Sequence, residues 1–368
     1  MFGATPGSVR DRASGVLPSA SMRHIASTHI LKTLALSETR GIARTHTAPI
    51  HWLSLDSIDS RYLLSGGADR SVHLLDLDAN GDTKHMVKSM AQAACHDSAV
   101  SCVSWYAVDT GMFATSSYDG TVKVWDTNAM AVAASFDLNA RVEMHAMSPT
   151  GAHALIAAAT QAKSLRLGDL RTGAFAQELG IPMQMCVAWS PRDPFVLASG
   201  GQDGRVHLWD VRRADTHVSG FAAHTKCVNS LLFAEHGAQI ASFGLDDKVR
   251  VWNVQDTCGA AAVDIPCPNS AQQAVQMCRT SSQTDGSDLL FVPCADRAVR
   301  VVDLAVSRIV AELHGHFEHP TCAAWRTGHM ELYSGGSDSS VLVWTPAASQ
   351  CLSAAQQAKR QDTWSDSD

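Results

Sequence analysis

The stretch SGGQDGRVHLWD, residues 199–210, sets a serine, an aspartate and a tryptophan at fixed intervals. The aspartate comes four positions after the serine, and the tryptophan comes six positions after the aspartate. The spacing recurs along the chain, with a hydrophobic residue replacing the tryptophan in some copies. The aspartates and their partners are Asp69 with Leu75, Asp119 with Trp125, Asp203 with Trp209, Asp246 with Trp252, Asp296 with Val302, and Asp338 with Trp344. The preceding hydroxyl residues are Ser65, Thr115, Ser199, Ser242 and Ser334.

The ends of the repeated units give their number. They fall at Asp76, Asp126, Asp169, Asp210, Asn253, Asp303 and Thr345, at intervals of 50, 43, 41, 43, 50 and 42 residues. A period of about 40 to 45 residues ending in Trp-Asp is typical of four-stranded propeller blades. We therefore predict an all-β fold, a seven-bladed propeller over residues 39–346. The third unit is degenerate, because Gly168-Asp169 stands where Trp-Asp is expected.

Closing the ring requires a last strand, because an open sheet edge invites aggregation. Pro346 follows the last unit and cannot donate a ladder hydrogen bond, and residues 347–368 have little strand character. We therefore expect the segment Thr39–Thr45 to supply the outer strand of the seventh blade. Residues 347–368 are predicted to be a disordered tail, with phosphorylation at Ser365 or Ser367 as an alternative role.

Histidine, hydroxyl and aspartate residues recur in four units, and a catalytic triad would need the same ingredients. A catalytic site is needed once, whereas copies point to a structural role. We predict a buried hydrogen-bond chain running from indole to hydroxyl to imidazole to carboxylate. Its members are His96, Thr115, Asp119 and Trp125; Ser199, Asp203 and Trp209; His224, Ser242, Asp246 and Trp252; and His316, Ser334, Asp338 and Trp344.

No pattern in the sequence predicts a catalytic residue, a cofactor or a metal ion. The ten cysteines include no C-x-x-C pair, and the histidines of HGHFEH, residues 314–319, are interpreted as rim residues. The balance of 29 basic and 36 acidic residues gives a net charge of -7, which argues against strong direct binding of nucleic acid. No apolar stretch approaches the roughly 18 residues of a membrane span.

Residues 1–38 form a predicted extension ahead of the ring. Met22, Ala26, Ile30 and Leu34 recur every four residues with Ile25 beside them, which indicates the apolar stripe of a short helix starting near residues 19–21. Such a helix would pack on the propeller or enter a groove of a partner. The competing interpretation is a transit peptide, since residues 1–37 hold four basic residues against one acidic residue.

The recurring motif resembles that of WD40 propellers, and one unit ends in Trp209-Asp210-Val211-Arg212. This W-D-x-R sequence resembles the motif of propellers that dock on the damaged-DNA-binding adaptor of cullin-RING ubiquitin ligases. In that family a helix ahead of the propeller enters the adaptor. The resemblance implies adaptor contacts at Met22, Ile25, Ile30, Leu34 and Arg212, with Arg171 as a weaker match. An ordinary solvated loop is the alternative interpretation of Arg212.

Longer stretches of the sequence resemble one particular family of WD40 proteins. Residues 62–76, 121–128, 189–214 and 331–344, together with the tail at 362–366, resemble the Cockayne syndrome group A family of WD40 substrate receptors. The resemblance implies a nuclear, non-catalytic receptor of a cullin-RING ligase in transcription-coupled nucleotide excision repair, which recognises repair factors at stalled RNA polymerase II. Unit four departs from the family, with Gly180-Ile181-Pro182 in place of its opening histidine. A WD40 scaffold for signalling or chromatin assemblies and, less well motivated, a propeller enzyme remain as alternatives.

Overall fold

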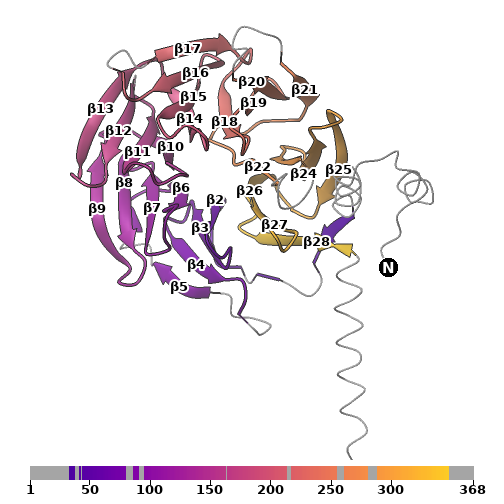
Figure 1. Ribbon diagram of the computed structural model, residues 1–368. Helices are drawn as coiled ribbons and strands as arrows, with labels where there is room; N and C mark the ends of the chain where they lie inside the picture. The colour runs from indigo at the N-terminus through magenta and orange to yellow at the C-terminus, as the bar shows by residue number, and fades with distance from the viewer. Residues whose placement is uncertain are drawn as a thin grey trace, which may run out of the picture.

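The computed structural model describes residues 33–37, 41–42, 44–79, 86–90, 95–162, 164–213, 217–254, 261–280 and 288–347. Strands β1 to β28 form seven four-stranded antiparallel sheets around a common axis (Figure 1). The predicted seven-bladed propeller is therefore confirmed. No helix in the described ranges is long and apolar enough to cross a membrane.

Blades 1 to 4 follow the chain from their inner to their outer strand. Blade 1 contains β2 (Ile50–Leu55), β3 (Tyr62–Gly67), β4 (Val72–Asp76) and β5 (Met86–Met90). Blade 2 contains β6 (Val100–Trp105), β7 (Met112–Ser117), β8 (Thr121–Asp126) and β9 (Ala131–Asp137). Blade 3 contains β10 (Val142–Met147), β11 (Leu155–Thr160), β12 (Ser164–Asp169) and β13 (Ala174–Gly180). Blade 4 contains β14 (Gln184–Trp189), β15 (Val196–Gly201), β16 (Arg205–Asp210) and β17 (His217–Ala222).

Blades 5 and 6 keep the same order, whereas blade 7 takes one strand from the start of the chain. Blade 5 contains β18 (Val228–Phe233), β19 (Gln239–Gly244), β20 (Lys248–Asn253) and β21 (Val263–Pro266). Blade 6 contains β22 (Cys278–Arg279), β23 (Leu289–Pro293), β24 (Ala298–Asp303) and β25 (Arg308–His314). Blade 7 contains β26 (Pro320–Arg326), β27 (Glu331–Gly336), β28 (Val341–Pro346) and β1 (Leu34–Leu36).

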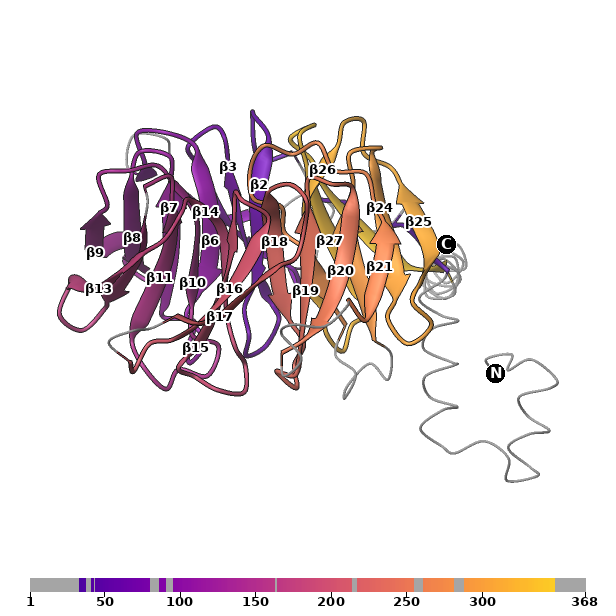
Figure 2. The same ribbon diagram turned by 90° about the horizontal axis from the view of Figure 1, so that it is seen from above.

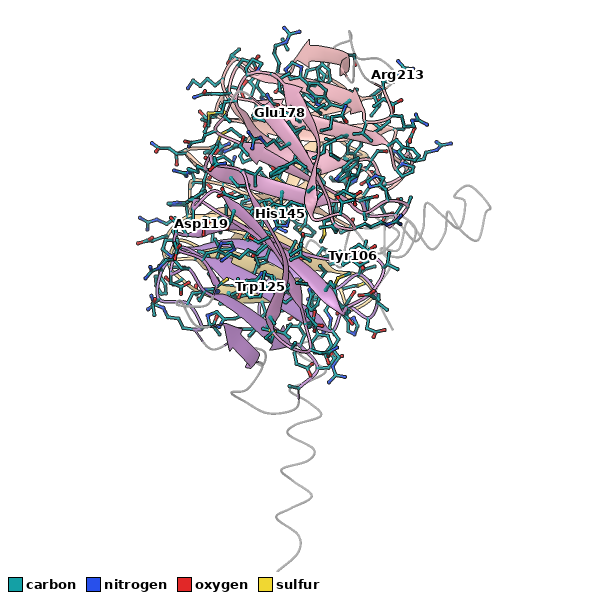
Figure 3. All side chains as sticks on the ribbon, turned by 90° about the vertical axis from the view of Figure 1, so that its left-hand side faces the viewer. Tyr106, Asp119, Trp125, His145, Glu178 and Arg213 are labelled. Atoms are coloured by element: carbon teal, nitrogen blue, oxygen red, sulfur yellow. The ribbon has the colours of Figure 1, made fainter. Side chains whose placement is uncertain are left out.

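The propeller has two faces, formed by opposite ends of the strands (Figure 2). We call the face with the turns between second and third strands the top, because those turns hold the repeated aspartates such as Asp119. The bottom holds the loops from first to second strand and from third to fourth strand. In the edge-on view of Figure 3 the top face is on the left, with Asp119, and the bottom face is on the right, with Tyr106 and Arg213.

Strand β1 closes the ring by pairing with β28, in the register Leu34 with Pro346 and Leu36 with Trp344. An N-terminal strand was expected, but its predicted position at residues 39–45 was wrong, and the propeller starts before the predicted boundary at residue 39. The predicted helix is also wrong at Leu34, which is extended and buried among side chains of blades 6 and 7. The four-residue period is a local signal, and the open edge of β28 overrides it with backbone hydrogen bonds.

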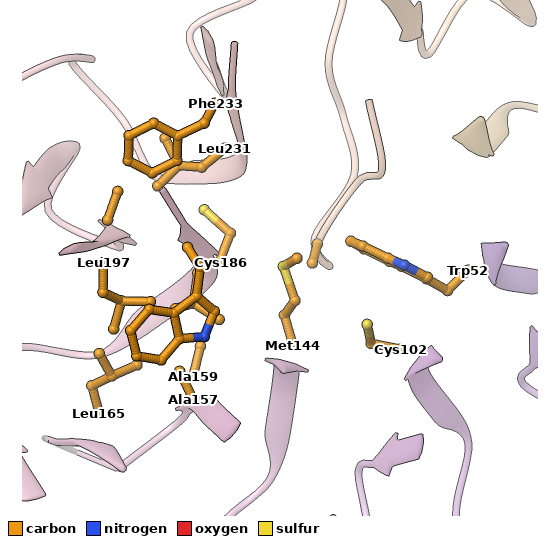
Figure 4. Close-up of a cluster of buried hydrophobic side chains, with 14 of the residues drawn as sticks. Trp52, Cys102, Met144, Ala157, Ala159, Leu165, Cys186, Leu197, Leu231 and Phe233 are labelled. Carbon is orange, nitrogen blue, oxygen red and sulfur yellow. The ribbon is translucent and has the colours of Figure 1, made fainter. Parts of the chain in front are cut away.

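Side chains from neighbouring blades interlock between the sheets. The largest buried cluster combines residues from the inner strands of blades 1 to 5 with residues from other strands (Figure 4). It includes Trp52, Cys102, Met144, Cys186 and Leu231. Most inner strands also contain a β-bulge, which re-aims a polar side chain. From two of these bulges, His51 donates to Val100 O of the next blade at 2.8 Å and Asn229 donates to Ala271 O at 3.1 Å.

The seam around blade 7 carries two further links. Gln276, just before the short strand β22, forms a parallel bridge with Cys322 of β26. Its side chain reaches past blade 7 to blade 1, donating to Leu53 O at 2.6 Å and accepting from Leu53 N at 2.9 Å. At the bottom, the fully buried Arg326 donates to Ser60 O at 2.7 Å and pairs with Asp78 at 2.7 Å. Blades 1 and 7 are therefore connected by contacts of Gln276 near the axis, by contacts of Arg326 at the bottom face, and by the closing strand β1.

The first test concerns closure by β1. Leu34→Asp places a charge at a site that is 7% exposed, and we expect a loss of about 3 kcal/mol in the free energy of unfolding. Leu36→Asp is the matched control, because its side chain lies on the same strand and is 43% exposed. Urea unfolding of the two variants measures the difference, and equal stability would contradict the role given to Leu34.

Candidate functional site

Blades 2, 5 and 7 each contain a continuous hydrogen-bond chain from an indole to a carboxylate. In each, the tryptophan Nε1 donates to a hydroxyl, the hydroxyl bonds to histidine Nε2, and histidine Nδ1 bonds to the turn aspartate. The three distances are 2.9, 2.7 and 2.8 Å for Trp125, Thr115, His96 and Asp119. They are 2.9, 2.8 and 2.7 Å for Trp252, Ser242, His224 and Asp246, and 2.7, 2.8 and 3.0 Å for Trp344, Ser334, His316 and Asp338.

Burial and hydrogen bonding fix the charge states in these chains. Burial raises the cost of ionising Asp119, but hydrogen bonds from His96 and Thr121 outweigh it and hold the pKa of the carboxyl well below its ordinary value. Burial lowers the pKa of His316, although Asp338 opposes the shift. The hydroxyls Thr115, Ser242 and Ser334 are fully buried, so a substrate has no access to them, and the chains serve to hold neighbouring strands together.

Blade 4 keeps only half of this chain. Trp209 donates to Ser199 Oγ at 2.9 Å, but the histidine is absent. The amide nitrogen of Gln184 lies 3.2 Å from where a Cβ on Gly201 would stand, in the space that histidine fills in blades 5 and 7. Asp203 consequently lacks an imidazole partner and is exposed. Sequence reasoning missed Gln184, because it lies outside the position where the repeat places histidine.

Blade 1 has the histidine and lacks the tryptophan. His46 Nε2 bonds to Ser65 Oγ at 2.9 Å, and its Nδ1 bonds to Asp69 Oδ1 at 3.0 Å. Leu75 occupies the tryptophan position and is fully buried. The hydroxyl of Ser65 therefore receives no hydrogen bond from an indole.

The histidines of HGHFEH do not converge. His314 lies 3.6 Å from Glu312, His316 belongs to the blade 7 chain, and His319 bonds to Ser337 Oγ at 2.8 Å. The described cysteines are free thiols. Burial raises the pKa of Cys322 to about 12, so that thiol stays protonated and unreactive.

Arg212 lies on the bottom face, on the loop after β16. Its Nε and Nη2 donate to the two carboxylate oxygens of Asp210 at 2.9 and 2.8 Å, and its guanidinium stacks 4.9 Å from the centre of the Phe195 ring. The side chain remains 53% exposed. Arg171 is exposed on the equivalent loop of blade 3, and no described residue forms a hydrogen bond or ion pair with its side chain.

A cavity of about 230 Å³ opens on the bottom face, and its lining residue Arg192 is followed by Asp193, which lies 3.9 Å from the Arg212 guanidinium. It is lined by Arg192, His236, Gly237, Ala238 and Val254, from loops of blades 4 and 5. The other predicted adaptor contacts, Met22, Ile25 and Ile30, lie outside the described residues. Leu34 is described, and its burial in the closing strand removes it from the bottom-face surface.

The top face presents an aromatic anchor that the sequence analysis did not identify. Phe317, directly after the blade 7 histidine, is 85% exposed. Its backbone amide donates to Asp338 at 3.0 Å, so the loop is fixed while the ring projects into solvent. Before the inner strand of blade 3, the Arg141 guanidinium stacks 3.6 Å from the Tyr118 ring centre and pairs with the buried Glu143 at 3.0 Å. Exposed aromatic and arginine side chains on a fixed frame are typical of binding surfaces.

The structural role of the chains predicts a stability difference between blades. We expect Asp338→Ala to lower the free energy of unfolding by about 2 kcal/mol, because it leaves His316 and the Phe317 amide without their acceptor. Asp203→Ala, at the equivalent turn without a histidine, should cost less than half as much. Urea unfolding compares the two, and an Asp338 variant as stable as the parent would refute the assignment.

Buried histidines predict a loss of stability in mild acid. Burial lowers the pKa of His145 to about 3, so between that pH and about 6.5 the unfolded chain binds a proton that the folded chain excludes. Stability therefore falls as pH drops below about 6.5, by about 2 kcal/mol from this residue at pH 5. The depressed carboxyl pKa values matter only below about pH 4.

Unfolding in urea at pH 7.5 and pH 5 measures this effect in the parent and in His145→Gln. The glutamine retains hydrogen-bonding groups for Ser104 and Ser116, which lie 2.7 and 2.8 Å from the ring nitrogens. The variant should lose about 2 kcal/mol less between the two pH values. An equal loss would show that His145 does not carry the dependence.

Comparison with known proteins agrees with the architecture. Residues 55–302 match the β-propeller family described as Nucleolar protein 10-like, N-terminal domain, and residues 307–345 match the WD domain, G-beta repeat. WD repeat-containing protein ATCSA-1 of Arabidopsis thaliana is 26% identical over 451 residues, covering 97% of this chain and 99% of that protein. Radiation-sensitive protein 28 of Saccharomyces cerevisiae is 27% identical over 207 residues, covering 46% of this chain and 41% of that protein.

E3 ubiquitin-protein ligase COP1 of Arabidopsis thaliana is 23% identical over 200 residues, covering 54% of this chain and 29% of that protein. The chain thus spans nearly the whole of the first relative and less than half of the other two. The family match covers more than half of the chain, and the structure has the seven blades that the repeats predict. The protein is a WD-repeat β-propeller that belongs to the nucleolar protein 10-like N-terminal domain family.

Proposed function

We propose that the protein is the substrate-recognition subunit of a cullin-RING ubiquitin ligase that acts in transcription-coupled nucleotide excision repair in the nucleus. In this role the bottom face binds the damaged-DNA-binding adaptor, which connects it to the cullin-RING core. The top face holds repair factors at stalled RNA polymerase II. The chain itself supplies binding surfaces, and the chemistry belongs to other subunits.

The observation that carries the proposal is Arg212 in its W-D-x-R context. The arginine lies on the bottom face and is oriented by Asp210 and Phe195, within the stretch 189–214 that resembles the Cockayne syndrome group A family. The similar proteins add support by their names, since one is called radiation-sensitive and another an E3 ubiquitin-protein ligase. WD repeat-containing protein ATCSA-1 matches along nearly its whole length.

A rigid propeller suits this role because it holds two partners at a fixed separation. A ligase accelerates transfer by keeping the substrate near the activated enzyme, which raises the effective concentration. Arg212 on the bottom and Phe317 on the top lie on opposite faces, and both have a fixed backbone or side-chain orientation. Binding then costs little ordering entropy at either face.

The test compares two arginines of blade 4. We expect Arg212→Ala to weaken binding to the purified damaged-DNA-binding adaptor at least tenfold, because it removes a central guanidinium from the interface. Arg205→Ala is the matched control, since Arg205 is exposed at the other end of β16. Binding is measured by calorimetry, and the thermal unfolding of both variants should stay close to that of the parent. Equal affinities for the two variants would contradict adaptor docking through Arg212.

The alternative is a WD-repeat scaffold for signalling or chromatin assemblies without a ligase role. Affinity purification of the full chain before and after ultraviolet irradiation separates the two functions. Co-elution of the adaptor and cullin, with repair factors after irradiation, is the expected result. A stable set of partners that contains neither adaptor nor cullin would favour the scaffold.

A further inference from the structure

Blade 1 differs at two positions from the other blades that contain a histidine and a turn aspartate. Leu75 replaces the tryptophan, as described above. His73 lies four residues after the turn aspartate, where blade 2 has Lys123 and blade 5 has Arg250. Both differences change the surroundings of one pair, His46 with Asp69, whose side chains are buried.

The equivalent position in other blades holds a cation against the carboxylate. In blade 5, Arg250 Nη1 lies 3.0 Å from Asp246 Oδ2 and 3.2 Å from His224 Nδ1. In blade 6, Arg300 Nη2 lies 2.6 Å from Asp296 Oδ2. In blade 5 a side-chain cation therefore lies between the imidazole and the carboxylate, and in blade 6 it lies against the carboxylate alone.

Blade 1 replaces that cation by metal-ligating atoms. His73 is 6% exposed, so its imidazole lies inside the blade beside the histidine and the carboxylate. One ligand atom each from His46, Asp69 and His73 lies within 4.8 Å of the other two. The Ser71 hydroxyl contacts all three, at 2.6 Å from Asp69 Oδ1, 3.0 Å from His73 Nε2 and 3.2 Å from His46 Nδ1.

The missing tryptophan frees the ring nitrogen that a metal needs. In blades 2, 5 and 7 the hydroxyl accepts a hydrogen bond from the indole and donates one to histidine Nε2. The proton of the neutral histidine is then on Nδ1. Ser65 receives no hydrogen bond from an indole, so its oxygen can accept a hydrogen bond from His46 Nε2–H across the 2.9 Å contact. His46 Nδ1 then presents a lone pair, and Ser65 orients the ring from behind, as the outer partners of metal-bound histidines do.

We propose that blade 1 binds a Zn²⁺ ion through His46 Nδ1, the Asp69 carboxylate and His73 Nε2, with the Ser71 hydroxyl or a water molecule as the fourth ligand. Two imidazoles and a carboxylate are common zinc ligands, and tetrahedral coordination places them about 2.0 to 2.2 Å from the ion. His46 keeps its one ring proton at Nε2, donated to Ser65, so the ion binds the neutral ring at Nδ1 without releasing a proton from it. His73 Nδ1 has no hydrogen-bond partner among the described residues, so the ring is held at one nitrogen only and can turn toward the ion.

The proposed site is structural, because it joins three separate segments of blade 1. His46 precedes the inner strand, Asp69 lies in the turn after β3, and His73 lies on β4. Blade 1 meets blade 7 at the seam where the ring closes. Metal binding there stabilises the folded chain, and its test does not depend on the adaptor and substrate contacts proposed above.

Blade 7 supplies an internal comparison. His316, Asp338 and Ser340 repeat the histidine, carboxylate and hydroxyl of blade 1, with Ser340 Oγ donating to Asp338 at 2.6 Å. Leu342 stands at the fourth position and offers no ligand. Two ligands do not hold zinc, so this blade indicates which single substitution should abolish the site.

The experiment uses the full chain after removal of metals with a chelator. Calorimetric titration with Zn²⁺ should show one equivalent bound, and Co²⁺ should give the absorption bands of a tetrahedral site. The unfolding temperature should rise with Zn²⁺, since binding to the folded state alone contributes about 2.7 kcal/mol at 100 times Kd. Absence of saturable Zn²⁺ binding, or a cobalt spectrum of octahedral type, would overturn the proposal.

Two variants copy other blades and test the third ligand. His73→Leu reproduces blade 7, and His73→Arg reproduces the cation of blade 5, so both should fold. We expect both to lose the stoichiometric Zn²⁺ binding and the rise in unfolding temperature. His319→Gln, which alters an exposed-rim histidine, should keep both. Zn²⁺ binding by the His73 variants equal to that of the parent would show that the ion binds elsewhere and refute the site.

Discussion

Pairing of β1 with β28 is the constraint on which the other blades depend. A blade buries its two faces only against its neighbours, so the sheets are stable together or not at all. Three residues, Leu34 to Leu36, complete the last sheet with backbone hydrogen bonds. Gln276 at the axis and Arg326 at the bottom strengthen the same seam. Closure therefore rests on contacts between segments that are far apart in the sequence.

The spacing of aspartate and tryptophan was sufficient to predict the seven blades, because it reflects a constraint that each blade satisfies internally. The hydroxyl, the turn carboxylate and the indole lie on consecutive strands of one sheet, so their separation along the chain is fixed by strand and turn length. Trp125 and Thr115 meet at 2.9 Å for this reason. Because the same spacing recurs in several units, the apparent triads could be interpreted as copies of one structural arrangement.

Features that depend on another blade could not be predicted in this way. Leu34 has the four-residue period of a helix, and only the free edge of β28 makes it a strand. Gln184 replaces a histidine from a different position in the unit, so the repeat pattern hides it. His73 was overlooked because its proposed role as a metal ligand depends on two other residues. Leu75 stands in place of the tryptophan, and His46 is close to His73 only in the folded structure. Local spacing describes what the blades share, whereas these residues mark where they differ.

The contact between Arg212 and Asp210 is not unique to blade 4, so it cannot by itself direct a partner to that blade. Arg61 in blade 1 makes the same two-pronged contact, to Asp76, and lies 5.2 Å from an aromatic ring centre. An arginine held by the carboxylate that ends a third strand is therefore a recurring way to fix a bottom loop. Orientation alone cannot distinguish the two sites for a partner. The difference lies in the neighbouring loop of blade 4, where Arg192 lines the bottom-face cavity and Asp193 lies 3.9 Å from the Arg212 guanidinium. We expect a partner that selects blade 4 to contact this loop as well as the guanidinium, because the arginine geometry alone is the same in blade 1.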